Sequence, residues 1–140
     1  LAVFATTTPT TRLDGFTITV GNADVSSNIT VNGETIYRNS GGGIFTSGGT
    51  NTLTNNSLSG NTASFGGGGG IYTEFSTYTL TNNIIWGNSS GIVNNGSTLT
   101  VTYSIVQGGF TGEGNLDADP LFVNQPAQGL GTSGDLRLRP

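Results

Sequence analysis

Two aspartates, Asp117 and Asp119 in LDADPLF, are the only two carboxylates close together in the sequence. Two nearby carboxylates can bind calcium, or they can act as a general acid and a general base. Aspartate beside proline is also common in turns, where the carboxylate accepts backbone N–H groups. We therefore expect a structural turn and no cofactor here. Asp117 and Asp119 stay weak candidates for a metal site, with calcium as the ion.

Charged side chains are scarce in the chain as a whole. Its 140 residues include four Lys or Arg and eight Asp or Glu, a formal net charge of −4, and no His, Cys or Met. Nucleic acid is excluded as a partner because phosphate binding needs clustered cations. No apolar run approaches the roughly 20 residues that cross a bilayer, so we expect no membrane span. The chain starts at Leu1, and we expect it to be a piece of a longer polypeptide.

Internal repeats organise most of the chain. GGGIFTSGGTNTLTNNSLSGN (41–61) aligns without a gap with GGGIYTEFSTYTLTNNIIWGN (68–88), a shift of 68 − 41 = 27 residues. Weaker copies lie at 100–109 and at 13–22. Such short units cannot bury an apolar face alone and need neighbours stacked on them. The intervening segment 23–40 is then an excursion from the first repeat.

Alternation of apolar and polar residues inside each repeat predicts short strands rather than helices. The expected fold is all-β: one right-handed parallel β-helix (a β-solenoid) of four to five coils over residues 1–140. Residues 110–140 are expected to form an irregular C-terminal closure. Three aliphatic columns should point inward, and their members are Leu13/Leu53/Leu80/Val101, Ile18/Leu58/Ile85/Val106 and Ile44/Ile71/Ile92.

Glycine and asparagine are expected at the corners between strands. Glycine tolerates a positive φ and close backbone approach, and stacked asparagines can form ladders with their amides bonded between coils. The expected ladder pairs are Asn56/Asn83 and Asn61/Asn88. Phe45 and Tyr72 follow inward isoleucines, so they should form an aromatic stack on the surface.

Outward threonines flank the first aliphatic column on successive coils. The expected rows are Thr52/Thr79/Thr100 and Thr54/Thr81/Thr102. They resemble the Thr-x-Thr arrays of ice-binding β-solenoids, although Arg12 and Asp14 interrupt them in the first coil. Threonine is also a favoured strand residue on any exposed face.

A second outward position changes from polar to apolar along the stack. Ile84, Trp86 and Ile105 should point outward and form an apolar patch, which often marks a contact surface. The structural alternative is that the C-terminal segment around Leu121 and Phe122 covers the patch. The functional alternative is stacking of Trp86 on a glycan.

The motifs LDGFTIT, GGGI and LTNN followed by GN resemble those of bacterial right-handed parallel β-helix repeat proteins of the cell surface. GGGI is similar to half of the repeat motif of polymorphic outer membrane proteins. GNLDADPLFVN (114–124) with GDLRL (134–138) resembles the closing segment of β-helix proteins that carry variable surface anchors. The resemblance implies an extracellular or cell-surface location.

We therefore expect a non-catalytic structural or adhesive module, part of an adhesin, stalk or filament. Its partners would be other copies, further coils of the parent chain, glycans or a neighbouring cell surface. The alternatives are an ice-binding solenoid and a carbohydrate-binding or carbohydrate-active β-helix. Parallel β-helices include pectate lyases and polygalacturonases, but their sites resemble clusters of Asp with Arg, Lys or His.

Overall fold

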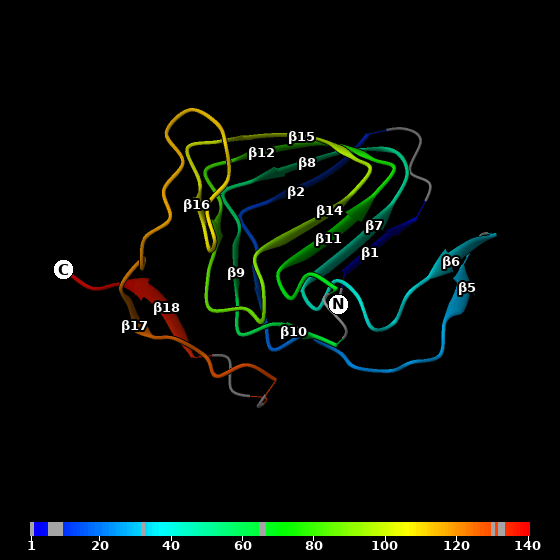
Figure 1. Ribbon diagram of the computed structural model, residues 1–140. Coiled ribbons are helices and arrows are strands. Elements are labelled where there is room, and N and C mark those ends of the chain that lie inside the picture. Colours follow the sequence, from blue (N-terminus) through cyan, green and yellow to red (C-terminus); the bar gives the residue numbers. More distant parts are fainter. Residues whose placement is uncertain (1, 6–9, 32, 65–66, 130, 132–133) are drawn as a thin grey trace.

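The computed structural model describes the chain except residues 1, 6–9, 32, 65–66, 130 and 132–133. Its strands wind into a parallel β-helix of four coils, within the predicted range, so the predicted all-β solenoid is confirmed (Figure 1). The described residues include no helix long and apolar enough to cross a membrane.

Three parallel sheets form the walls of the helix (Figure 1). The first contains β1 (Ala2–Ala5), β7 (Ile44–Ser47), β11 (Ile71–Glu74) and β14 (Ile92–Asn95). The second contains β2 (Thr11–Asp14), β8 (Thr50–Thr54), β12 (Thr77–Thr81) and β15 (Thr98–Thr102). The third contains β3 (Thr17–Thr19), β9 (Ser57–Ser59), β13 (Ile84–Ile85) and β16 (Ile105–Val106). Each coil contributes one strand to each wall.

The registers of these strands confirm the three predicted aliphatic columns. Leu53 pairs with Leu80, Leu58 with Ile85, and Ile44 with Ile71. These residues form one buried cluster, against which Leu13 and Ile18 pack at one end. A fourth inward column, Asn51/Tyr78/Leu99 on the second wall, was not predicted, although the same alternation places it inside.

Two asparagine ladders hold the coils in register, as predicted. Asn56 Nδ2 donates to Asn83 Oδ1 at 3.1 Å, and Asn61 Nδ2 donates to Asn88 Oδ1 at 2.9 Å. Each ladder asparagine also bonds to the main chain of the preceding coil, as when Asn83 Nδ2 donates to the Leu53 carbonyl at 2.9 Å. Buried peptide groups at the corners are therefore hydrogen-bonded by side chains.

The glycine runs lie where the coils approach most closely. Gly41 and Gly68 have φ of +65° and +52°. A Cβ atom on Gly43 would lie 2.6 Å from the carbonyl oxygen of Gly70, so any side chain there would collide with the next coil. The predicted need for glycine at this corner is confirmed.

The segment 23–40 leaves the first coil after β4 (Asn22–Ala23), which pairs with β10 (Thr62–Ala63). It contains an antiparallel hairpin of β5 (Ile29–Val31) and β6 (Glu34–Ile36) beside the stack (Figure 1). Ile36 is fully buried, and the Tyr37 ring lies 6.3 Å from the ring of Phe45. The expectation of a surface position is wrong for Phe45, which is buried although it stacks on Tyr72 at 5.5 Å.

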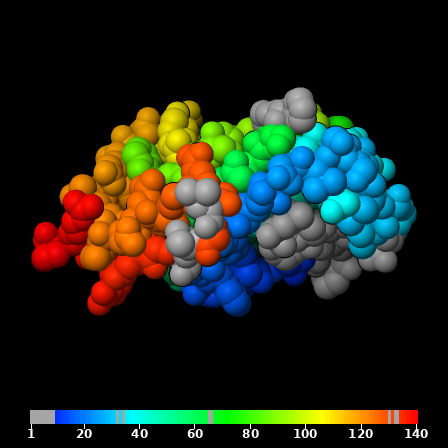
Figure 2. Space-filling view, turned by 90° about the horizontal axis from the view of Figure 1, so that it is seen from below, coloured from blue at the N-terminus to red at the C-terminus, as the bar shows by residue number. Residues whose placement is uncertain are grey.

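The C-terminal region closes the other end of the stack. Leu116 forms a parallel bridge with Ile105, and Phe110 packs against the core cluster. The chain then forms an antiparallel pair of β17 (Phe122–Asn124) and β18 (Asp135–Leu138) beside the third wall (Figure 1). In the view from below, this segment and the β5–β6 hairpin occupy opposite sides of the molecule (Figure 2).

Candidate binding surfaces

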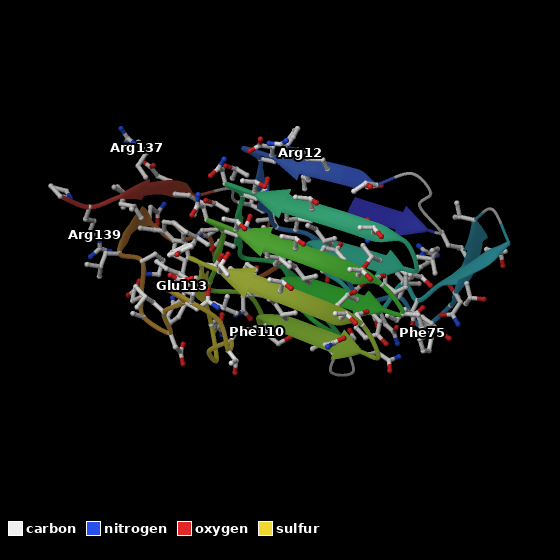
Figure 3. The ribbon with its side chains drawn as sticks, turned by 90° about the horizontal axis from the view of Figure 1, so that it is seen from above. Arg12, Phe75, Phe110, Glu113, Arg137 and Arg139 are labelled. Atoms are coloured by element: carbon white, nitrogen blue, oxygen red, sulfur yellow. The ribbon has the colours of Figure 1, made fainter. Side chains whose placement is uncertain are left out.

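A regular array of threonines covers the outer side of the second wall. The strands β8, β12 and β15 read TNTLT, TYTLT and TLTVT in matching register. The predicted rows Thr52/Thr79/Thr100 and Thr54/Thr81/Thr102 are in register, and a third row was missed: Thr50/Thr77/Thr98. We call these nine residues the threonine face; Figure 3 looks onto this wall from above.

The threonine side chains are arranged on a nearly regular two-dimensional grid. Neighbouring strands lie about 4.8 Å apart, and alternate residues along a strand lie about 6.6 Å apart. Thr79 and Thr100 are exposed, whereas the row at the end of the strands is half-buried. The hydroxyls of Thr81 and Thr102 lie 3.3 Å apart and bond to each other.

The threonine face ends at the first coil. There the outward residues of β2 are Arg12 and Asp14, which form an ion pair at 2.6 Å. The Asn55 amide and the Arg12 guanidinium both donate to the Asp14 carboxylate, and they lower the pKa of Asp14. Figure 3 shows Arg12 at this end of the stack and Phe110 toward the other.

Asp117 and Asp119 are exposed, and each accepts a backbone N–H group. Asp117 Oδ1 accepts from Gly108 N at 3.0 Å, and Asp119 Oδ1 accepts from Leu121 N at 2.8 Å. In the described part of the chain, no three His, Cys, Asp or Glu side chains are grouped so that they could hold a metal ion. These bonds are those of the predicted structural turn; calcium binding at this pair stays a hypothesis.

Ile84, Trp86 and Ile105 are all half-buried on the outer side of the third wall. The C-terminal segment runs beside them. A Cβ atom on Gly87 would collide with the Gln125 side chain, and one on Gly60 would lie 2.9 Å from the Pro126 ring. Phe122 is buried, whereas Leu121 is about half exposed. A contact function for this patch stays a prediction.

A shallow groove of about 390 Å³ lies between the third wall and β18. Hydroxyls of Thr17 and Ser57 lie on one side, and the Asp135–Arg137 ion pair, at 2.6 Å, lies on the other. The Arg137 side chain and backbone N–H both donate to Asp135, and they lower its pKa to about 2. The groove could not be predicted from the sequence, because nothing local places β18 against β3 and β9.

One comparison with known proteins identifies the family. The model of the right handed beta helix region matches residues 8–115, most of the chain. No curated protein and no solved structure matches the chain significantly. The four stacked coils, their parallel registers and this match agree, and the chain therefore belongs to the right-handed β-helix family.

Proposed function

We propose that the domain is a non-catalytic structural and adhesive module of a secreted or cell-surface bacterial protein. The observation that carries the proposal is the threonine face, a regular and partly exposed array of threonines on three stacked strands. Repeating hydroxyls and methyl groups match a partner that itself repeats, such as the surface of a packed polysaccharide.

Asparagine and aspartate side chains outside the threonine face form hydrogen bonds within the chain, which supports the same proposal. The ladder asparagines bond to neighbouring coils, and the Asp117 and Asp119 carboxylates accept backbone N–H groups. A group held this way is poorly placed to move a proton or bind a substrate. A pectate-lyase-like activity would be indicated instead by cleavage of polygalacturonate that is lost in Asp117→Asn.

Adhesion is tested by sedimentation with insoluble particles. We expect the protein to pellet with microcrystalline cellulose or chitin, and Thr79→Tyr to reduce the bound fraction by about tenfold because it interrupts the centre of the face. Thr30→Tyr, on the exposed β5–β6 hairpin, is the matched control and should bind normally. Equal binding by the two variants would show that the threonine face is not the surface that binds the particles.

Ice binding is a second candidate, favoured by the third threonine row. Three rows on three coils give a regular grid of methyl and hydroxyl groups that could order water. Ice binding would be supported if the protein without substitutions shows thermal hysteresis, Thr79→Tyr abolishes the hysteresis and Thr30→Tyr keeps it. Hysteresis without particle binding would favour ice over polysaccharide as the partner.

A further inference from the structure

The two ends of the coil stack are built differently. At the downstream end, the segment after β16 bonds to the last coil: Tyr103 N donates to Glu113 O at 2.8 Å, and Leu116 N donates to Ser104 O at 2.9 Å. Asn115 continues the first ladder there, since its Oδ1 accepts from Ser104 N and its Nδ2 donates to Val101 O. The tail therefore covers this end over the third wall and at Val101, whereas no described strand pairs with the outer edges of β14 and β15.

The upstream end is open over the described residues. No described strand pairs with the outer edge of β2 or β3. Leu13 and Ile18, the last members of two core columns, are only half-buried, and Phe16 between them is 56% exposed. Unpaired strand edges beside an apolar end favour association with another chain.

The ladders argue against a further coil of the same repeat at this end. Each ladder asparagine bonds to the coil before it: Asn56 bonds to Phe16 N and Leu13 O, and Asn61 bonds to Gly21 N and Ile18 O. The first coil has Phe16 and Gly21 at these two positions. A preceding parallel coil would find no side chain for its corner peptide groups.

The edge strand β2 is complementary to itself instead. It reads TRLD, and its outward residues Arg12 and Asp14 lie on either side of Leu13. If two copies of β2 pair antiparallel with Leu13 opposite Leu13, each Arg12 lies opposite the Asp14 of the other copy. Charges on an edge often block pairing, but charges that alternate in this way become attractive across a twofold axis.

We propose that two copies of the domain associate head to head through their upstream ends, as a twofold-symmetric dimer centred on β2. The Asp14 carboxylate keeps acceptor sites for a second guanidinium while it bonds to Arg12 and Asn55. An interface of this kind is closed and stops at two copies. Because a twofold contact occupies the upstream end of both copies, it produces dimers and not filaments.

The test is the molecular mass in solution of the 140-residue chain, by sedimentation equilibrium and light scattering at several concentrations. We expect a concentration-dependent dimer that weakens as salt is raised, because the ion pairs lie near the solvent. Arg12→Glu places two carboxylates opposite each other across the twofold axis and should raise the dimer dissociation constant about tenfold or more. The reversed pair, Arg12→Glu with Asp14→Arg, should restore the dimer.

The Asp135–Arg137 pair provides a matched control. It has the same spacing in the sequence and the same 2.6 Å distance, but it lies on β18, which pairs with β17 in a sheet separate from that of β2. Arg137→Glu should leave the dimer unchanged, and circular dichroism should show that all variants are folded. A monomer at every concentration, filaments, or an unchanged dimer in Arg12→Glu would overturn the proposal. This result does not depend on whether the threonine face binds polysaccharide or ice.

Discussion

Each asparagine of the two ladders contributes hydrogen bonds that join neighbouring coils and stabilise the stack. Asn83 is buried and makes four side-chain bonds: it accepts from the backbone N–H and amide of Asn56 and donates to the carbonyls of Leu53 and Thr81. Removing one partner of a buried bond costs more than the bond itself contributes, because the other group is left without a partner. At the residue scale, stability should therefore depend on amides as much as on the aliphatic columns.

Asn83→Leu should lower the free energy of unfolding by about 3–5 kcal/mol, because it leaves the buried Asn56 N–H without its acceptor and removes one donor from the Leu53 carbonyl. Asn83→Ser should cost less, since Ser104 already occupies the corresponding position one coil later and its hydroxyl accepts from Asn83 N. Urea unfolding measures both values. Equal losses for the two variants would show that volume, and not hydrogen bonding, determines the cost.

The β5–β6 hairpin is an added element and not part of the coil stack. Among the described residues its strands pair with each other and with no third strand, and buried Ile36 and the Tyr37 ring beside Phe45 attach it to the stack. An element held by so few contacts can open without unfolding the rest of the protein.

Ile36→Ala should detach the hairpin while the coils stay folded. The substitution should cost about 2–4 kcal/mol of packing free energy. This cost is large compared with the marginal stability of a two-stranded hairpin. Limited proteolysis should then cut between residues 24 and 40, and amide exchange should rise there but not in β12. Ile29→Ala, at a position 45% exposed, is the control and should have little effect. Global unfolding of Ile36→Ala would show that the hairpin supports the whole stack.

The elements that could be predicted from the sequence are those that repeat. Matching positions in successive coils must hold similar side chains, so the Leu53–Leu80 and Ile44–Ile71 pairs followed from alignment alone. The burial of Phe45 did not follow, because the hairpin that covers it has no copy elsewhere. Asp117 and Asp119 form a candidate site by residue type, but only the backbone around Gly108 and Leu121 shows what their carboxylates bond to.

At the scale of the whole molecule, the dependence of stability on pH is expected at the acid and alkaline ends of the pH range. The chain has no histidine, the residue that ordinarily titrates near neutrality. The pKa values of Asp14 and Asp135 are lowered in the folded protein by their hydrogen bonds to Asn55, Arg12 and Arg137. Their contribution is therefore present above the ordinary aspartate pKa of about 4 and is lost as the pH falls below it, for Asp135 as the pH approaches about 2. Asp14 is exposed and Asp135 lies half-buried at the surface, where solvent screens its ion pair, so this acid effect should be small.

The alkaline side should depend on Tyr78, whose phenol is buried in the centre of the stack beside Thr46. Burial raises the pKa of Tyr78, so the unfolded chain loses this proton near pH 10 while the folded protein keeps it. The free energy of unfolding should then fall by about 1.4 kcal/mol per pH unit above pH 10. Tyr78→Phe should remove this slope in urea unfolding measured from pH 9 to 12, whereas Tyr103→Phe, at an exposed position, should keep most of it. An unchanged slope in Tyr78→Phe would mean that the phenol reaches solvent in the folded protein, and that the interior of the solenoid is less tightly closed than its registers imply.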